Sequence, residues 1–456
     1  MDREVTLSEV LEAREARAMR QRALLEAYGQ PVISFCMNIA GPVKNGTAIR
    51  RGFREGMMRL SEALRGARME IAHCEQVDAV TGCEALLAVR GDAWEIKRLC
   101  VDLEDEDALG RLFDLDVLAP GGEKLDREQL GMPPRPCLIC GQAGKGCASR
   151  RVHSFEELQI KTAHILRGHF VRSDGDRVAG QAARALLYEV CATPKPGLVD
   201  RANSGSHRDM DVFTFLDSVA ALLPYLREAF FIGNRTAERP SAETFRQLRR
   251  AGLRAERVIF SATSGVNTHK GAIFSLGTVC AAAGRLWTPE APRAPIEALL
   301  SECARMSSDA VAGDFAAIHA EGAVTSGQKL YAARGLRGIR GELADGLPSV
   351  AQIGLPALRG AISRGATLEQ AGIHALLHLI AGVEDTNLYA RGGPDGQSWA
   401  VAQAARLIES GFDRAAVSAL DAEFIGRNLS PGGCADLLAI VYFLYFYSKE
   451  GSDNEC

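Results

Sequence analysis

Four consecutive polar side chains precede an apolar run in the segment GVNTHKGAIFSLG, residues 265–277. Most helices begin with a single capping residue, whereas several donors near a helix start suit a triphosphate or another strong anion. The segment therefore predicts an anion site, and a polar helix cap that faces water is the alternative. The four donors are an amide, a hydroxyl, an imidazole and an ammonium group, from Asn267, Thr268, His269 and Lys270.

Four further segments of the C-terminal half combine polar side chains with glycine, which lets a backbone approach a ligand closely. Each is also explained as a polar surface loop, and Asp209 or Asp211 would serve as a helix N-cap. No Walker A sequence, G-x4-G-K-[ST], occurs in the chain. The candidate residues are His207, Asp209 and Asp211 in segment 191–211, Arg340 and Glu342 in segment 337–350, Asp385, Asn387 and Arg391 in segment 382–396, and Ser430, Gly432 and Gly433 in segment 428–439.

Two carboxylates, Asp114 and Asp116, alternate with apolar residues in GRLFDLDVL, residues 110–118. Residues two apart on a strand share a face, so both carboxylates would point away from the core. Because Mg²⁺ prefers oxygen ligands and often bridges to phosphates, the pair predicts a Mg²⁺ site. The alternative is a solvated acidic face on an edge strand. Lys44, beside a Gly-Pro turn after strand 32–40, is a candidate phosphate ligand.

Three cysteines and one histidine have the spacing C-x2-C-x6-C-x5-H. Thiolate and imidazole ligands at such spacings are typical of a structural Zn²⁺ site. A metal-free cluster of thiols is the alternative. The residues are Cys137, Cys140, Cys147 and His153.

The 456 residues exceed one ordinary core, so two domains are expected. Hydrophobic content of 47% and charged content of 24% describe a soluble globular protein. A net charge of −4 argues against a nucleic-acid partner. The charged N-terminus lacks a signal-peptide core, and the apolar run 436–447 is shorter than the ~20 residues that span a bilayer. Twelve cysteines without a secretory signal favour free thiols, a cytoplasmic location and no membrane partner.

The apolar periodicity changes near residue 180. The first part mixes helices and strands, which predicts an α+β domain over 1–166, and the charged, glycine-containing stretch 167–179 is interpreted as a linker. Helical segments then follow one another without a convincing strand, which predicts an all-α domain over 180–456. The expected helices are 7–28 and 47–65, then 180–192, 211–231, 241–263, 271–284, 295–311, 366–382, 413–424 and 433–448, and the expected strands are 32–40, 69–75 and 111–118.

GRLFDLDV, with TGCEALLAVRGDAWEIKRLCVDLEDE upstream and CLICGQAGKGCASRRVHSFEEL downstream, resembles the citrate lyase holo-[acyl carrier protein] synthase family over about residues 5–165. The resemblance implies a nucleotidyltransferase-like domain. It would transfer a phosphoribosyl-dephospho-CoA group from a triphosphate precursor to a serine of the apo acyl carrier (γ) subunit of citrate lyase, releasing pyrophosphate. Asp114 and Asp116 would hold Mg²⁺ on the triphosphate. The family's chemistry does not call for zinc.

The blocks PKPGLVDRANSGSHRDMD, GVNTHKGAIFSLG, GIRGE, DTN and LSPGGCADLLA resemble the triphosphoribosyl-dephospho-CoA synthase family over about residues 180–440. The resemblance implies ATP and 3′-dephospho-CoA as substrates. Adenine is displaced from the ribose of ATP. The ribose carbon that carried adenine then forms a bond to a hydroxyl oxygen of dephospho-CoA, and the triphosphate stays intact. We expect Asn267, Lys270 and Arg340 to clamp this triphosphate.

The same resemblance implies carboxylates that hold Mg²⁺ or stabilise an oxocarbenium-like ribose, roles we assign to Asp209, Asp211 and Asp385. A base must remove the hydroxyl proton, for which His207 or a nearby aspartate is the candidate, and His269 would protonate the departing adenine.

The two resemblances name consecutive steps, so we expect a bifunctional enzyme. One alternative is the same pair of activities serving malonate decarboxylase. A second is a nucleotide or ADP-ribose glycosidic hydrolase in the helical half, which would release free ribose triphosphate from ATP. A third is a non-catalytic assembly factor that binds the carrier protein.

Overall fold

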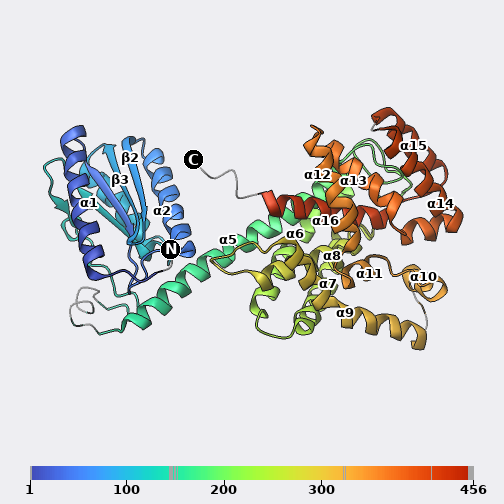
Figure 1. Cartoon of the computed structure of the whole chain (residues 1–456), viewed down its shortest axis with the longest axis horizontal. Coiled ribbons are helices and arrows are strands. Elements are labelled where there is room, and N and C mark those ends of the chain that lie inside the picture. Colours follow the sequence, from blue (N-terminus) through green and yellow to red (C-terminus); the bar gives the residue numbers. More distant parts are fainter. Residues whose placement is uncertain are drawn as a thin grey trace. The chain divides into compact units, whose positions relative to one another are not determined.

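The computed structural model describes residues 3–142, 147, 150, 152–321, 323, 325–411 and 413–449. The chain forms two compact units, Met1–Ser173 with Thr288–Glu290 and Asp174–Trp287 with Ala291–Cys456 (Figure 1). The stretch 167–179, expected as a linker, is helical and belongs to α5 (Phe155–Cys191). Within the described ranges, no helix combines the length and apolarity needed to cross a membrane.

The first unit is α+β, as predicted. Its sheet has the order β2-β3-β1-β4-β5, and each neighbouring pair is antiparallel. The sequence patterns had located α1, α2, β1, β2 and β4 but missed β3 and α3. The elements are α1 (Leu7–Tyr28), β1 (Val32–Met37), α2 (Thr47–Gly66), β2 (Glu70–Ala79), β3 (Gly82–Arg90), α3 (Ala93–Asp105), η1 (Gly110–Leu112), β4 (Phe113–Leu118), β5 (Lys124–Leu125) and η2 (Arg127–Leu130).

Helices cover both faces of this sheet (Figure 1). On one face, Leu24 of α1 is buried against Val32 and Leu86. On the other, Phe35 stacks on Phe53 of α2, with ring centroids 4.9 Å apart. Successive side chains of a strand point to opposite faces of the sheet. One set of side chains therefore lies beneath α1, and the other set enters the core shared with α2 and α3.

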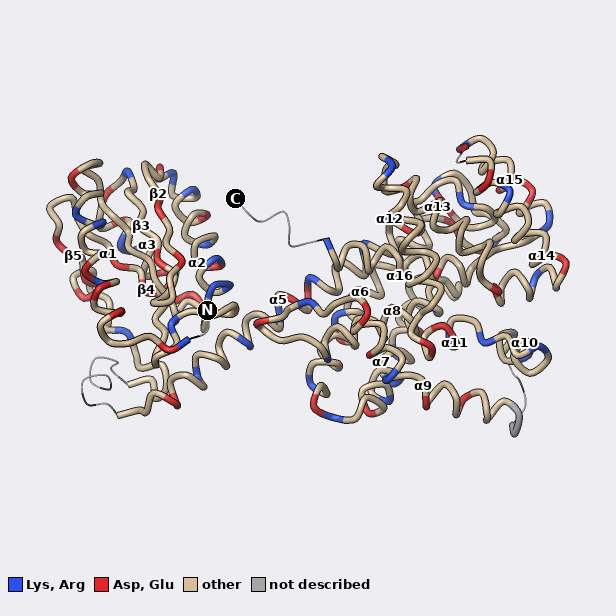
Figure 2. The backbone as a smooth tube through the Cα atoms, viewed as in Figure 1, with Lys and Arg blue, Asp and Glu red and all other residues tan. Residues whose placement is uncertain are grey.

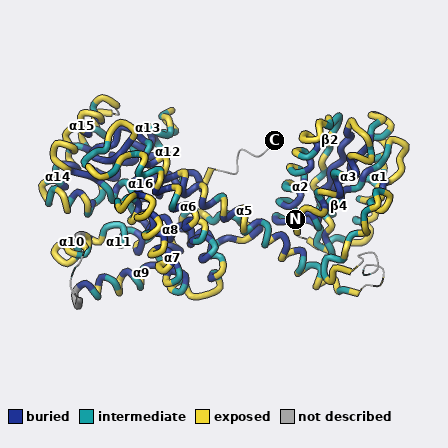
Figure 3. The backbone as a smooth tube through the Cα atoms, turned by 180° about the vertical axis from the view of Figure 1, so that it is seen from behind, coloured by how far each residue is buried: buried dark blue, intermediate teal, exposed yellow. Residues whose placement is uncertain are grey.

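The second unit is all-helical in its described residues, also as predicted. Its central helices α8 and α16 carry many of the buried residues (dark blue in Figure 3). Its elements after α5 are α6 (Val212–Arg235), α7 (Ser241–Ala262), α8 (Lys270–Leu286), α9 (Ile296–Glu321), α10 (Ser326–Arg334), α11 (Gly338–Ala344), η3 (Val350–Gly354), α12 (Leu355–Ser363), α13 (Leu368–Gly382), α14 (Thr386–Ser410), α15 (Arg414–Gly426) and α16 (Gly432–Lys449).

The interpretation of segments 337–350 and 382–396 as loops is wrong in part, because α11 occupies half of the first segment and the start of α14 occupies most of the second. Glycines and Pro394 hide the helical pattern of α14. The helix accommodates them by a kink at Gly393, whose φ of 63° suits glycine.

Glycine allows α6 and α8 to cross closely. A Cβ at Gly233 would lie 1.9 Å from the backbone oxygen of Ala281, whereas one at Gly180 on α5 would meet nothing within 4 Å. The first contact is with rigid backbone, so a methyl group there forces the helices apart.

We predict that Gly233→Ala lowers the free energy of unfolding of the helical unit by about 1–3 kcal/mol. Gly180→Ala, the matched control, should raise it by up to about 1 kcal/mol because alanine favours a helix. Urea unfolding followed by helical circular dichroism measures both. Equal effects of the two substitutions would contradict the close-packing argument.

Candidate active sites

Strand β4 places Asp114 and Asp116 on the face that lies beneath α1. Both carboxylates are half-exposed, while Phe113, Leu115 and Val117 are buried on the opposite face. This confirms the predicted alternation. Figure 2 marks the charged positions of the unit in red and blue.

Each aspartate has a partner on this face. Lys124 Nζ lies 2.7 Å from an Asp116 carboxylate oxygen, and the Cys36 thiol donates to Asp114 over 3.6 Å. Burial and the Asp114 charge raise the pKa of Cys36 to about 12, so the thiol stays protonated. The pair therefore shares its surface with an exposed cation and a neutral thiol, to which Arg17 donates at 3.4 Å.

Basic residues of α1 lie over the neighbouring strands. Arg17 and Arg20 both pair with Glu84, at 2.9 and 2.6 Å. Glu84 on β3 stands opposite Cys36 on β1, and Cys36 stands opposite Asp114 on β4, so one strand separates Glu84 from the aspartates. Lys44 donates to the Ile39 carbonyl, and burial followed by the charge of Arg14 lowers its pKa.

In the helical unit, Asp385 connects the N-termini of two helices. As the N-cap of α14, its Oδ1 accepts hydrogen bonds from the backbone N–H groups of Asn387 and Leu388, at 2.7 and 3.2 Å. Its Oδ2 accepts from the N–H of Cys434 in the first turn of α16, at 2.8 Å. The side chain is 2% exposed, and burial raises its pKa despite these three donors.

A recess opens where α11, α14 and α16 begin. Gly338, at the start of α11, lies against Thr386, and Gly433 lies against Asp385, each too close for an unstrained Cβ contact. The recess has a volume of about 280 Å³ and is also lined by Arg337. Glu342 lines it too, held by the N–H and hydroxyl of Ser349.

Behind this recess lie acidic groups that the sequence analysis had missed. Asp436 on α16 fills the space at Gly271, where a Cβ would be 1.8 Å from its carboxylate. Burial and the charges of Glu189 and Asp385 raise the pKa of Asp436 to about 8. The sequence does mark Asp436 as unusual, because it is the one charged residue in the apolar stretch 432–448.

Glu189 is itself paired with a buried lysine. Lys195 Nζ lies 2.5 Å from a Glu189 carboxylate oxygen, and both side chains are almost fully buried. The loop after Lys195 is fastened by Asp200, which accepts from the Lys195 N–H at 3.0 Å, and by Asp421 of α15, which accepts from the Gly197 N–H at 2.8 Å.

His269 is 3% exposed at the N-cap of α8. The Thr268 hydroxyl donates to Ser218 Oγ at 2.7 Å, so the Ser218 hydroxyl donates in turn to His269 Nδ1, also at 2.7 Å. The hydrogen of the imidazole is then on Nε2, which is buried without a partner in the described structure. Burial and the charge of Lys195 lower the pKa of His269 to about 3.

His207, Ser430 and Arg391 come together from distant segments. His207 Nε2 lies 3.0 Å from Ser430 Oγ, and Arg391 donates to His207 Nδ1 at 3.3 Å. Because arginine only donates, Nδ1 accepts and Nε2 donates to Ser430. Burial and the Arg391 charge lower the pKa of His207, so the ring is neutral near pH 7. Asn387, one turn before Arg391 on α14, lies against Gly432.

Other predicted residues lie elsewhere. Asn267 and Lys270 line a separate hollow, where Lys270 pairs with Glu256 at 3.2 Å. Arg340 is half-exposed and pairs with Asp314 at 3.5 Å. Their joint action as a clamp stays a prediction.

Asp209 and Asp211, which the sequence analysis assigned to Mg²⁺ in the helical unit, are exposed. Asp211 is the N-cap of α6, accepting from the Thr214 N–H at 2.9 Å, which is the alternative considered from the sequence. Asp209 contributes to the electrostatic environment of His207. Their role as metal ligands stays a prediction.

Two family models match the chain. One, described as ATP:dephospho-CoA triphosphoribosyl transferase, matches residues 175–455. The other, described as apo-citrate lyase phosphoribosyl-dephospho-CoA transferase, matches residues 5–169. The matched regions agree closely with the helical unit and the α+β unit.

Similar proteins cover either the whole chain or the helical unit. Protein CitXG of Leuconostoc mesenteroides subsp. cremoris is 35% identical over 463 residues, covering 96% of this chain and 97% of that protein. Protein CitXG of Haemophilus influenzae is 32% identical, covering 97% and 96%. A probable 2-(5″-triphosphoribosyl)-3′-dephosphocoenzyme-A synthase of Pectobacterium carotovorum subsp. carotovorum is 45% identical over 294 residues, covering 64% and 97%.

The full-length relatives share the order of the two regions as well as the length of this chain. Both family models describe transferases, and both belong to the biosynthesis of the citrate lyase prosthetic group. The chain therefore belongs to the CitXG family of bifunctional transferases.

Proposed function

We propose that the helical unit makes 2′-(5″-triphosphoribosyl)-3′-dephospho-CoA from ATP and 3′-dephospho-CoA, and that the α+β unit attaches its phosphoribosyl-dephospho-CoA part to a serine of the apo acyl carrier subunit of citrate lyase. One observation carries the proposal. The recess at the N-termini of α11, α14 and α16 lies within the region that matches the ATP:dephospho-CoA triphosphoribosyl transferase family.

The first reaction breaks the ribose–adenine bond of ATP and forms a bond from the same carbon to a hydroxyl oxygen of dephospho-CoA. The hydroxyl proton passes to a base, and adenine leaves with a proton. The triphosphate is carried through unchanged. The site must therefore hold polyphosphate firmly without activating it for attack.

Helix N-termini meet that requirement. Free N–H groups and aligned peptide dipoles attract anions without supplying a nucleophile or an acid. Glycines at the starts of α11 and α16 leave the backbone open to a ligand. Arg337 in the wall pairs with Asp345 at 2.7 Å, and Glu342 and Glu384 add negative charge, so a divalent cation would have to accompany the triphosphate. We assign the triphosphate to this recess, with Asn267, Lys270 and Arg340 as further candidates for its clamp.

Proton transfer is assigned from the electrostatics. A histidine with a pKa of about 3 is a poor acid near neutral pH, so His269 acts as a neutral hydrogen-bond donor through Nε2. Asp436, with a pKa of about 8, still holds its proton and protonates the departing adenine. His207 is neutral and has its lone pair on Nδ1, so as the base it takes the hydroxyl proton there, in place of its hydrogen bond from Arg391.

In the second reaction, the serine hydroxyl of the carrier loses its proton to a base or to water, its oxygen attacks the first phosphorus of the triphosphate, and pyrophosphate leaves. The two carboxylates on one face of β4 form a donor set that fits Mg²⁺, which neutralises phosphate charge when bound. Asp114 and Asp116 would hold the ion, and Lys124, which pairs with Asp116 at 2.7 Å, would offer a positive charge to the leaving pyrophosphate.

We predict that Asp385→Asn lowers the rate of adenine release from ATP and dephospho-CoA by about 100-fold or more, because an amide replaces the acceptor that joins α14 to α16. Transfer of preformed triphosphoribosyl-dephospho-CoA to the carrier by the same variant should be unchanged. Asp413→Asn, at the exposed N-cap of α15, is the control and should keep adenine release. Normal release by Asp385→Asn would refute the assignment.

Asp114→Asn should produce the opposite pattern. Carrier labelling from the preformed intermediate should fall by about 100-fold or more, since one of the two metal-binding carboxylates is lost, while adenine release stays normal. Asp102→Asn, an exposed aspartate on α3, should leave both activities intact. Unimpaired labelling by Asp114→Asn would rule out the carboxylate pair.

The raised pKa of Asp436 makes a prediction about stability. The folded protein holds this proton up to about pH 8 while the unfolded chain loses it near pH 4, so Asp436 costs stability as the pH rises through that window. Asp436→Asn should therefore raise the Tm of the helical unit at pH 8 and have little effect near pH 4. A Tm difference independent of pH would show that Asp436 titrates normally.

A further inference from the structure

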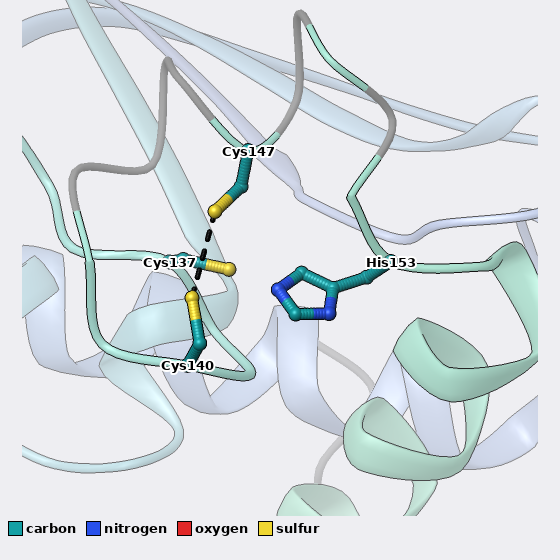
Figure 4. A group of neighbouring side chains, drawn as sticks. All are labelled: Cys137, Cys140, Cys147 and His153. Atoms are coloured by element: carbon teal, nitrogen blue, oxygen red, sulfur yellow. Dashed lines mark hydrogen bonds between the residues drawn. The ribbon is translucent and has the colours of Figure 1, made fainter.

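Three cysteines and a histidine of the α+β unit come together after η2. Their candidate ligand atoms all lie within 4.8 Å of one another. Figure 4 shows the sulfurs of Cys140 and Cys147 facing each other, 3.5 Å apart, with the Cys137 sulfur and the His153 ring beside them. Two segments contribute, so the cluster joins chain positions up to sixteen residues apart.

The backbone around Cys137 is folded as a tight turn that surrounds its sulfur. The Ile139 N–H points to Cys137 Sγ at 3.5 Å, and the Gly141 N–H donates to the Cys137 carbonyl at 3.1 Å. The Cys137 N–H donates in turn to the carbonyl of Gln142 at 2.6 Å. Gly141 has a φ of +72°, which a side chain would strain. The turn therefore holds the Cys137 sulfur within reach of the other candidate ligand atoms.

His153 supplies an independent observation. Its Nε2 atom is buried and has no hydrogen-bond partner in the described structure. A buried polar nitrogen without a partner is costly, so native structures normally satisfy it. A metal ion bound among the three sulfurs would do so.

We propose that Cys137, Cys140, Cys147 and His153 bind a structural Zn²⁺ ion. Four protein ligands complete a tetrahedron and leave no open position for chemistry. With Zn–S bonds of about 2.3 Å, the ligand atoms would be about 3.8 Å apart, so the cluster needs to contract by about 1 Å or less. A Cys140–Cys147 disulfide would leave Cys137 and His153 without a role.

The cysteine–histidine cluster is connected to strand β4, which carries Asp114 and Asp116, through the two residues that precede Cys137. Arg135 donates to the carbonyls of Phe113 and Arg111, at 2.8 and 3.1 Å, and pairs with Glu104. Arg111 donates back to the Pro136 carbonyl at 2.5 Å. A metal that fixes Cys137 therefore fixes the start of β4, one residue before Asp114.

Metal analysis of the full-length, tag-free protein tests the site without relying on activity. We expect about one zinc per chain, and a cobalt-substituted protein with thiolate-to-cobalt charge-transfer bands and tetrahedral ligand-field bands. Cys140→Ser and His153→Ala should lose the metal, whereas Cys74→Ser, at an exposed free cysteine of the same unit, should keep it. His153→Cys should restore binding, which separates ligand loss from misfolding.

The proposal is overturned if the purified protein holds no more zinc than Cys140→Ser, or if intact mass shows Cys140 and Cys147 joined as a disulfide. Its link to the carboxylate pair rests on the proposed function of the α+β unit. Zinc loss should reduce carrier labelling by about 10-fold or more while adenine release stays normal. Full labelling by a zinc-free variant would overturn the positioning role alone.

Discussion

The Asp385 carboxylate is the contact on which the helical site depends. It accepts backbone N–H groups from the first turns of α14 and α16, helices that begin almost fifty residues apart in the chain. Without an acceptor there, two helix N-termini would carry buried, unpaired donors at the same point. The recess beside this junction therefore owes its shape to a capping interaction, and any attraction for an anion there has to come from the helix dipoles and from N–H groups that Asp385 does not accept.

In the α+β unit, local strand geometry is enough to bring the candidate metal ligands together. Strand alternation alone places Asp114 and Asp116 on one face, and their partners are an exposed lysine and a neutral thiol. In the proposed function the two units treat the same triphosphate in different ways. The helical unit would hold it at helix N-termini and leave it intact, and the α+β unit would offer carboxylates for a metal ion that promotes its cleavage.

Local patterns predicted the fold class of both units, the alternation at Asp114 and Asp116, and Asp211 as a possible N-cap. They did not reveal α11 and α14, whose glycines and Pro394 mask helical periodicity. Asp436 was missed because its significance depends on Glu189 and Asp385, which are remote in sequence. Burial and long-range charge shift its pKa, and neither quantity can be obtained from local spacing. The same limit explains why His269 was assigned an acid role that its environment disfavours.

The central claim is that one chain performs two consecutive transfers, and intact-mass measurement of the carrier tests it most directly. Apo acyl carrier subunit of citrate lyase is incubated with this protein, ATP, Mg²⁺ and 3′-dephospho-CoA, alongside the carrier of malonate decarboxylase. The account predicts that the citrate lyase carrier gains the mass of one phosphoribosyl-dephospho-CoA group and that adenine and pyrophosphate are released in equal amounts. An unmodified carrier, with ATP converted to free ribose triphosphate or left intact, would contradict it.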